Sequence, residues 1–271
     1  MKVGNTEVHF IEVKSAISQS GLPDLDYALN PYLGCSHGCI YCYARLYTKD
    51  ERASKNWGKV VLVKTNLVEV LKKEVKRKKK GIVGVGTITD AYQPLEAIYK
   101  LTRRSVKILL ESGFYLSFQT KNPLILRDKE ILLNYREKVD VGFTITSLKS
   151  SVSKFIEPNA PFPISRANAI RALSKEGIKT WIFYGPIIPR INDDRETADA
   201  IVTLAVETGS TLFYDSLHIK SFMLNDTYPL NEIIRTFDKA RVKNFLNFLK
   251  KRCEEEGIIC KGGFEEEKKS F

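Results

Sequence analysis

The chain has 271 residues, of which 43% are hydrophobic and 28% are charged, a composition that is typical of a globular protein and excludes the disordered and collagenous classes. Lysine and arginine (43) outnumber aspartate and glutamate (32), and the resulting formal net charge of +11 raises the question of a polyanionic partner such as a nucleic acid. No stretch approaches the length of apolar sequence that spans a membrane, and the N-terminus lacks an apolar signal core, so we expect a cytoplasmic protein with no membrane partner.

The first predicted elements, in chain order, are extended segments. Residues 6–15 alternate between polar and apolar side chains, which predicts a short strand or hairpin arm. Residues 26–32 form a second extended segment. Residues 64–80 fit a helix with Asn66 as its N-cap and Glu69 three positions later, because apolar side chains then recur on one face.

From residue 81 onward, predicted strands alternate with predicted helices. Apolar and β-branched runs predict strands at 81–88, 114–120, 139–146, 180–185 and 211–217. Helical patterns lie at about 94–112, 124–137, 164–176 and 194–208. This alternation indicates βαβ units and a parallel sheet. With the segment at 26–32 there are six strands, and periodicity alone does not distinguish a partial barrel from an open doubly wound sheet.

Polar residues cluster directly after the predicted strands. Both architectures bind ligands beyond the carboxyl ends of their strands. The clustered residues are Thr87, Thr89, Asp90, Gln119, Thr120, Lys121, Thr146, Ser147, Asp215, Ser216 and His218. We therefore expect the functional site at this end of the sheet.

Three cysteines lie close together in the loop that follows the segment at 26–32. Cys35, Cys39 and Cys42 are spaced by four and three positions, so their thiolates can converge on one centre. Gly34 and Gly38 lower the steric cost of folding the backbone around that centre. Three thiolates without a fourth ligand match an iron–sulfur cluster that leaves one iron open.

Two other interpretations of the cysteines stay open. Structural zinc normally takes a fourth protein ligand, and neither His37, wedged between two cysteines, nor the distant Cys253 is well placed to supply it. Unliganded thiols are the other alternative. Cys253 and Cys260 are too few for a second cluster, so we expect structural thiols or a disulfide.

The cysteine motif carries a family resemblance. Cys-x-x-x-Cys-x-x-Cys with Tyr41 before the last cysteine resembles the signature of the radical S-adenosylmethionine (radical SAM) superfamily. The longer string NPYLGCSHGCIYCYAR at 30–45 resembles the branch that includes spore photoproduct lyase. Further segments match that branch in order: GTITDAYQPLE (86–96), LTRRSVKIL (101–109), QTKNPLILRD (119–128), EPNAPFPISR (157–166) and GPIIPRIND (185–193).

The resemblance implies an α/β fold, a partial (β/α)6 barrel of the TIM type. The barrel would span residues 26–220, after a short N-terminal extended segment at 1–25 and before a C-terminal helical extension at 221–271 that packs on it. Cys35, Cys39 and Cys42 would hold a [4Fe–4S] cluster whose open iron binds S-adenosylmethionine. The reduced cluster would then cleave this cofactor to a 5′-deoxyadenosyl radical, which abstracts hydrogen from an unidentified substrate, with nucleic acid as one candidate.

The partners and the apolar cofactor contacts follow from the same resemblance. A reductant such as ferredoxin or flavodoxin would supply the electron. Tyr41 would pack near the adenine of S-adenosylmethionine, with Ile187 and Ile188 flanking it. Ser147 is the candidate for a ribose hydroxyl.

The polar contacts to the methionine part of the cofactor are also implied. Thr87, Thr89 and Asp90 match the position that binds its amino group, while Lys121 and Arg166 suit its carboxylate through charge-assisted hydrogen bonds. In each case a structural role is the alternative. A threonine or serine at a strand end can cap the next helix, and lysine and arginine are mostly surface charges.

The reaction of the family's named branch fits this chain poorly. Spore photoproduct lyase repairs a thymine dimer in DNA and uses an additional cysteine to return a hydrogen atom to the product radical. This chain has no cysteine between Cys42 and Cys253, which argues against thymine-dimer repair. Tyr43, next to the cluster, is the candidate catalytic hydrogen donor in its place.

A second function class depends on the basic segment at 64–80. Its eight Lys and Arg residues and two Glu supply +6 of the net charge. Such a run is either the solvated face of an outer helix or a contact for phosphate backbones. In a barrel the end of this helix points away from the active site. The alternative function is a nucleic-acid-binding protein with a structural zinc or iron–sulfur site and no radical chemistry.

Overall fold

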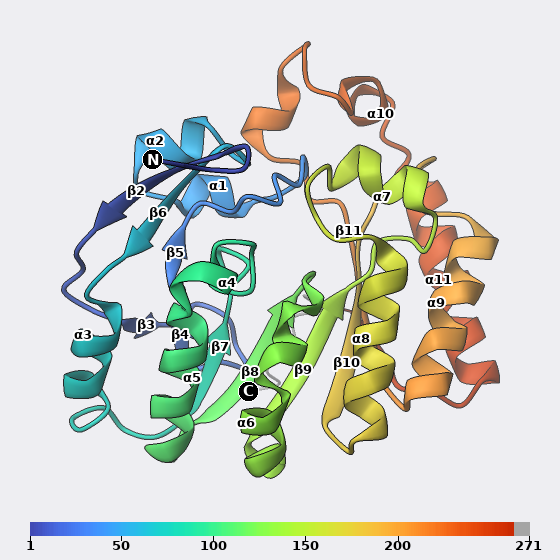
Figure 1. Ribbon diagram of the computed structural model, residues 1–271. Coiled ribbons are helices and arrows are strands. Elements are labelled where there is room, and N and C mark those ends of the chain that lie inside the picture. The colour runs from blue at the N-terminus through green and yellow to red at the C-terminus, as the bar shows by residue number, and fades with distance from the viewer. Residues whose placement is uncertain (263–271) are drawn as a thin grey trace, which may run out of the picture.

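The computed structural model describes residues 1–262 and contains one large sheet and one small sheet (Figure 1). The large sheet has the order β12-β11-β10-β9-β8-β7-β4-β3. Its central strands all pair in parallel, and they are β4 (Tyr27–Leu29), β7 (Ile82–Val85), β8 (Tyr115–Thr120), β9 (Val139–Thr144), β10 (Lys179–Ile187) and β11 (Thr211–Ser216). These six strands confirm the α/β class and the predicted strand positions.

The edges of the large sheet remain apart. β3 (Ile17–Gln19) pairs antiparallel with β4 at one edge, and β12 (Cys260–Gly262) pairs parallel with β11 at the other. Because β3 and β12 do not pair with each other within residues 1–262, the sheet is open there and no closed barrel forms.

Helices connect consecutive parallel strands as the pattern predicts. They are α3 (Leu67–Glu74), α4 (Glu96–Tyr99), α5 (Leu101–Glu111), η1 (Pro123–Asp128), α6 (Lys129–Asn134), η2 (Arg136–Lys138), α7 (Ser150–Ile156), α8 (Pro163–Lys175) and α9 (Arg195–Thr208). The predicted helix at 94–112 is divided at Lys100, whose φ is 51°. The short helix α7 was not predicted.

The small sheet contains a strand that the sequence analysis missed. Its order is β1 (Lys2–Val3), β2 (Thr6–Ile11), β6 (Val60–Lys64) and β5 (Tyr32–Leu33). β6 is buried in its first four residues and pairs in parallel with β2. The predicted helix at 64–80 is therefore wrong at its start, since Lys64 ends a strand.

Asn66 is the N-cap residue of α3 as predicted, but its side chain does not cap the helix. Instead of capping α3, the side chain of Asn66 bonds the backbone of Val13, accepting from its N–H at 2.8 Å and donating to its carbonyl at 3.0 Å. The helix ends at Glu74 because the residues from 76 to 80 are all lysine or arginine and bring no apolar side chain to the core.

The lysine run lies at the amino ends of the parallel strands. Tyr27, which begins β4, donates its hydroxyl to the carbonyl of Lys79 at 3.1 Å. The Lys80 ammonium lies 4.6 Å from the ring centroid of Phe114, the residue before β8. This position confirms that the run faces away from the carboxyl ends.

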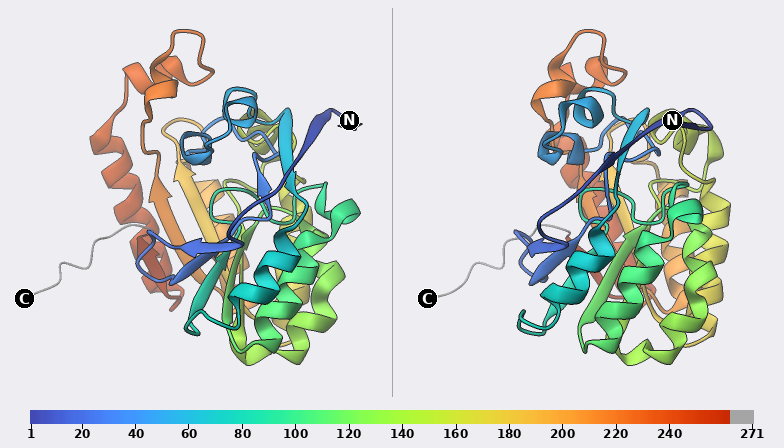
Figure 2. Two further views of the ribbon diagram at one scale, coloured as in Figure 1. Left: turned by 90° about the vertical axis from the view of Figure 1, so that its left-hand side faces the viewer. Right: turned by 60° about the vertical axis from the view of Figure 1, so that its left-hand side comes forward.

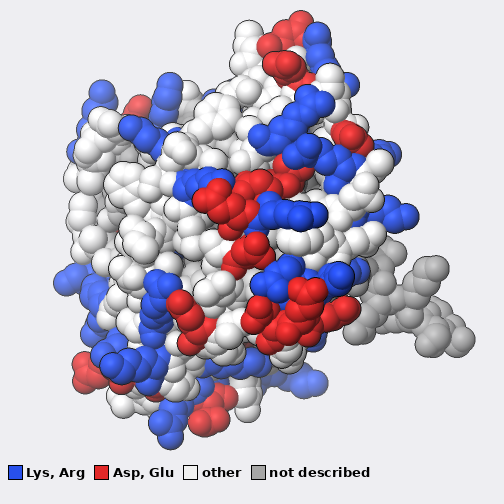
Figure 3. All heavy atoms as spheres, turned by 90° about the vertical axis from the view of Figure 1, so that its right-hand side faces the viewer, with Lys and Arg blue, Asp and Glu red and all other residues white. Residues whose placement is uncertain are grey.

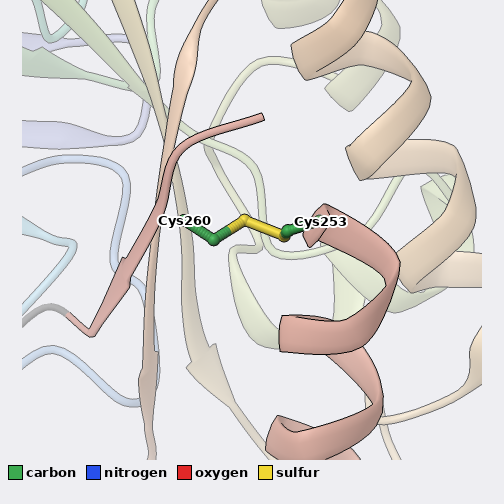
Figure 4. Close-up of a disulfide and its surroundings, with 2 residues drawn as sticks. All are labelled: Cys253 and Cys260. Carbon is green, nitrogen blue, oxygen red and sulfur yellow. A yellow bond between two sulfur atoms is a disulfide. The ribbon is translucent and has the colours of Figure 1, made fainter. Parts of the chain in front are cut away.

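The C-terminal segment combines helices with one unexpected strand. It contains η3 (Ser221–Leu224), α10 (Asn231–Arg235), α11 (Lys239–Glu255) and β12. A disulfide between Cys253 and Cys260 joins α11 to β12 (Figure 4), which confirms one of the two predicted alternatives. The last residues of the predicted helical extension, 263–271, lie outside the described residues.

The loops that follow the carboxyl ends of the strands gather at the top of Figure 1, with α7, α10, α1 (Ala44–Tyr47) and α2 (Glu51–Lys55). The views in Figure 2 place the small sheet beside this end. Ala53 of α2 packs there on Val60 and Leu62 of β6. Among residues 1–262, no helix is both long enough and apolar enough to cross a membrane.

Candidate active site

The cysteine loop follows β5 and presents three free thiols. Cys35 and Cys39 are buried and Cys42 is half-buried. Burial raises the pKa of the Cys39 thiol to about 11 and that of Cys42 to about 12, while the ammonium of Lys121 acts in the opposite direction on both. Because the thiolate is the form that binds a metal, a half-buried cation beside two of the thiols favours ligation.

Two glycines let the loop pass close to its neighbours. Gly38 has a φ of +62°, and a Cβ there would lie 3.0 Å from the Cα of Gly58. Gly34 has a φ of +83°, and a Cβ there would lie 2.5 Å from the carbonyl oxygen of Val60. Side chains fit poorly at both positions, so glycine lowers the steric cost of this backbone path, as predicted.

Gln93 holds the loop from one side. Its side chain is fully buried, donates to the carbonyl of Gly34 at 3.2 Å and accepts from the N–H of Ser36 at 2.9 Å. The hydroxyl of Thr89 donates to the same Gly34 carbonyl at 2.7 Å. The loop after β7 therefore fixes the start of the cysteine loop.

The segment after α7 holds the loop from the other side. The N–H of Ile40 donates to the carbonyl of Ile156 at 2.9 Å. Asn159 donates its backbone N–H to His37 at 3.2 Å and its side-chain amide to Ser36 at 3.1 Å. The two sets of hydrogen bonds clamp the cysteine loop between the loop after β7 and residues 156–159.

A buried carboxylate, Glu157, lies at the centre of a charged network in this second contact. The hydroxyl of Tyr41 donates to it, Arg166 Nη1 lies 2.6 Å away, and Lys121 Nζ lies 4.0 Å away. Ser153 donates to it at 3.2 Å. Burial acts to raise the pKa of Glu157, but Arg166 and Lys121 outweigh it and hold the pKa below its usual value.

A second buried carboxylate, Asp90, faces the cysteine loop from the loop after β7. His37 Nδ1 lies 3.3 Å from it, and it accepts from the Thr120 hydroxyl at 2.7 Å and the Lys121 N–H at 2.8 Å. Burial acts against its charge, but His37 and these hydrogen bonds lower the pKa of Asp90 to about 2. Burial acts to lower the pKa of His37, but Cys35 and Asp90 outweigh it and raise that pKa to about 9.

The loop also contains buried polar atoms that lack a partner. The Ser36 hydroxyl and His37 Nε2 are buried without a hydrogen bond, and buried polar groups are rarely left so. Three free thiols beside these atoms fit a loop built around a group ligated by sulfur. Within residues 1–262, no three His, Cys, Asp or Glu side chains already stand close enough together to hold a metal ion, so convergence of the thiols stays a prediction.

Residues 217–237 cover the loop with an apolar cluster. Tyr41 and Ile40 pack against this cluster, to which Ile188 also belongs. The hydroxyl of Tyr228 donates to the carbonyl of Ile40 at 3.0 Å. The segment after β11 thus excludes water from one side of the cysteine loop.

The model of the Radical SAM superfamily matches residues 29–201. The chain belongs to the radical SAM superfamily. It is therefore an enzyme, and its curated relatives leave the reaction open. An uncharacterised protein of Methanocaldococcus jannaschii is 31% identical over 258 residues, which are 92% of this chain and 96% of that protein. An uncharacterised protein of Mycobacterium tuberculosis is 31% identical over 225 residues, 78% of this chain and 65% of that protein.

Solved structures confirm the radical SAM fold. Spore photoproduct lyase complexed with dinucleoside spore photoproduct superimposes with a TM-score of 0.65 at 14% identity, over 95% of this chain and 82% of that one. Streptococcus suis SuiB bound to S-adenosylmethionine gives a TM-score of 0.59 at 13% identity, over 88% and 50%. At these identities the likeness concerns the fold, and it agrees with the resemblance found in the sequence.

Three motif residues in the loop after β7, namely Thr87, Thr89 and Asp90, contact the cysteine loop or the segment just before it. Thr89 bonds Gly34 and Asp90 faces His37, as described above. The hydroxyl of Thr87 accepts from the Asn30 amide at 3.0 Å. The three residues predicted to meet the cofactor's amino group thus lie together, and each makes a structural hydrogen bond as well.

The two cations predicted to meet the cofactor's carboxylate differ in their surroundings. Arg166 is 0% exposed and also donates to the carbonyls of Thr144 at 3.1 Å and Pro161 at 2.9 Å. Lys121 is 17% exposed, and its ammonium lies 5.8 Å from the ring centroid of Tyr41. Only Lys121 combines partial exposure with a position beside the thiols.

The residues predicted near the adenosine lie in several environments. Ser147 is buried and accepts from the N–H of Lys149 at 3.0 Å in a turn just before α7, whose own N-cap, Lys149, makes no side-chain capping bond. Ile187 belongs to the main core, whereas Ile188 packs with the 217–237 cluster and Tyr41. Of these three, Ile188 shares a hydrophobic cluster with Ile40 and Tyr41 of the cysteine loop.

Tyr43, predicted as catalytic, lies where the radical SAM loop reaches the surface. Its ring is 38% exposed, and its hydroxyl donates to the carbonyl of Thr87 at 2.9 Å. The ring of Tyr47 meets it edge-on at 5.8 Å. Tyr43 is thus both accessible and held in place.

Sequence reasoning missed Gln93, Asn159 and Glu157 as site residues. All three lie inside the motif segments at 86–96 and 157–166. Their presence in those motifs was the only available signal, because nothing in the chain order reveals which polar residue of a motif contacts a loop far away in sequence.

Proposed function

We propose that this radical SAM enzyme holds a [4Fe–4S] cluster on Cys35, Cys39 and Cys42 and binds S-adenosylmethionine at the open iron. When bound, the cluster and cofactor together supply a 5′-deoxyadenosyl radical that takes a hydrogen atom from the substrate. The observation that carries this proposal is the loop itself, whose three free thiols lie between hydrogen bonds from buried Gln93 on one side and from Asn159 on the other.

The surrounding residues would bind and orient the cofactor. Lys121 presents an ammonium for the carboxylate, and Asp90, with Thr87 and Thr89, presents oxygen acceptors for the amino group. Ile188 lies in the apolar cluster that shields the loop from water, which protects a reactive intermediate from side reactions.

The sequence-based predictions for the adenosine part of S-adenosylmethionine are retained in this proposal. Tyr41 and the isoleucines would pack against the adenine, and Ser147 would reach a ribose hydroxyl. Arg166 stays a second carboxylate candidate, although its donors already have partners.

Tyr43 is proposed as the hydrogen donor to the product radical. Its phenol lies one residue beyond Cys42 and is exposed enough to meet a substrate. The nearest cysteine after Cys42 in the sequence is Cys253, which is buried and disulfide-bonded to Cys260, so neither is available for this task. Thymine-dimer repair by the cysteine route is therefore not proposed.

Nucleic acid is the proposed substrate class, and a ferredoxin or flavodoxin the proposed reductant. The structural neighbour spore photoproduct lyase was solved in complex with dinucleoside spore photoproduct, which supports the first. The net charge supports it weakly, because the lysine run lies at the opposite end. On the face formed by α9 and α11, charges of both signs are interspersed (Figure 3), with Arg252 paired to Asp199 and Glu255.

Metal analysis tests the proposal against a structural zinc site. The chain is purified anaerobically and reconstituted with iron and sulfide, and iron, sulfide and zinc are measured per chain. We expect about four iron and four sulfide, both lost in Cys39→Ala. One zinc per chain without sulfide would contradict the proposal and support the nucleic-acid-binding alternative.

A further inference from the structure

Glu157 links the cysteine loop to both cations of the site. We propose that Glu157 is a positioning residue for S-adenosylmethionine. Its carboxylate holds Tyr41 and Arg166, which fixes the loop and leaves Lys121 as the cation that meets the cofactor's carboxylate. This inference rests on the proposed function.

The guanidinium of Arg166 already bonds Glu157 and backbone carbonyls. Its Nη1 lies 2.6 Å from Glu157, both side chains are 0% exposed, and its Nη2 donates to Ser153 at 3.2 Å. A cofactor carboxylate at Arg166 would have to displace Glu157 from a buried ion pair. Breaking such a pair is costly because it leaves an uncompensated charge in the interior.

Lys121 is the cation left available. Its ammonium lies 4.0 Å from the carboxylate of Glu157, at the limit of an ion pair, and its side chain is 17% exposed. Burial acts to lower the pKa of Lys121, but it is outweighed by nearby groups that include Cys39 and Cys42, so the ammonium stays charged beside two of the thiols. An incoming carboxylate can therefore meet Lys121 without disturbing the pair between Glu157 and Arg166.

Tyr41 connects Glu157 to the cysteine loop. Its hydroxyl donates to Glu157, and in sequence it lies between Cys39 and Cys42. The backbone of Ile40 is bonded to Ile156, next to Glu157. The carboxylate thus anchors the part of the loop that carries two of the three thiols, as outer groups do around many metal sites.

Glu157→Gln tests this role, with Asp128→Asn as the matched control. Asp128 is also 0% exposed and accepts from a tyrosine, Tyr92 at 3.2 Å, and an arginine, Arg103 at 2.6 Å. Its side-chain partners are Tyr92, Arg103 and Arg127, and none of them belongs to the cysteine loop. Both variants lose one buried charge, so both are expected to lower the melting temperature.

The decisive readout is the dissociation constant for S-adenosylmethionine, taken from the change it causes in the electron paramagnetic resonance spectrum of the reduced cluster. We expect Glu157→Gln to bind about ten- to a hundredfold more weakly than wild type, with Asp128→Asn close to wild type. Equal constants for wild type and a folded Glu157→Gln would overturn the positioning role while leaving the proposed function intact.

Tyr41→Phe keeps the inference testable if Glu157→Gln does not fold. It removes one hydroxyl and no charge, and the ring stays in place. We expect binding about tenfold weaker than wild type and a cluster spectrum that differs from wild type. An unchanged constant in Tyr41→Phe would also overturn the role. A wild-type chain that builds no cluster would overturn the proposed function and this inference together.

Discussion

At the scale of single residues, Gly38 is the tightest point of the cysteine loop. We predict that Gly38→Ala lowers both the stability and the iron content of the reconstituted protein. The positive φ alone costs an alanine about 1–2 kcal/mol, and its Cβ would also press on Gly58 and on the Asn159 amide, at 3.0 and 3.3 Å. Iron per chain and the melting temperature are the measurements.

Gly177→Ala is the control for that prediction. Gly177 has a similar φ of +77°, but a Cβ there would meet nothing within 4 Å. It should therefore lose stability without losing iron. If both variants bound iron as wild type does, the close contact of Gly38 would not be needed for the cluster.

Single residues also show what sequence could and could not predict of the site. The spacing of the cysteines predicted the site at Cys35, Cys39 and Cys42, because three thiols within eight consecutive residues can meet without any contact between distant parts of the chain. Glu157 and Gln93 were not found, because their partners Tyr41 and Ser36 lie 116 and 57 positions away. A buried hydrogen bond across that separation has no local signature.

At the scale of elements, α9 begins with a charged cap that makes stability depend on pH. Asp194 accepts from the Thr197 N–H at 3.0 Å and hydroxyl at 2.8 Å. Burial acts to raise its pKa, but these bonds and Lys149 lower it below the usual value. The stabilisation is therefore complete above the unfolded-state pKa of about 4 and is lost as pH falls below it.

We predict that Asp194→Ala lowers the free energy of unfolding by about 1 kcal/mol at pH 7. Urea denaturation at pH 7 and below pH 4 measures this difference. The gap between wild type and Asp194→Ala should narrow in acid as the wild-type carboxylate becomes protonated. A gap that stays the same at both pH values would mean that the charge of Asp194 contributes nothing.

The elements themselves were predictable where the pattern was local. The strands β7 to β11 were found because each is an apolar run followed by a helical period. β6 was missed because VVLVK runs directly into the amphipathic pattern of α3, and an extended partner for it, β2, lies more than 50 residues earlier. Asn66 is the N-cap residue as predicted, but the partner of its side chain, Val13, could not be predicted because it lies 53 positions away.

At the scale of the whole molecule, the disulfide ties the last described strand to the fold. Cys253 and Cys260 enclose a short loop between α11 and β12, and β12 pairs with β11 at the sheet edge. We predict that reduction lowers the free energy of unfolding by about 2–3 kcal/mol. Thermal unfolding with and without a thiol reductant measures this.

The double variant Cys253→Ser with Cys260→Ser is the control for the disulfide. It should unfold at the temperature of the reduced wild type and should not respond to the reductant. A response in the double variant would place the effect of reduction at Cys35, Cys39 or Cys42 instead.

The central claim is that the cysteine loop builds a cluster that cleaves S-adenosylmethionine. The most direct test is the 5′-deoxyadenosine released from S-adenosylmethionine under dithionite by the reconstituted chain and by Cys39→Ala. We predict release by wild type and none by Cys39→Ala, because two thiolates cannot hold the cluster with its open iron. A wild-type chain that carries the full cluster yet releases no 5′-deoxyadenosine would contradict it, as would equal release by Cys39→Ala.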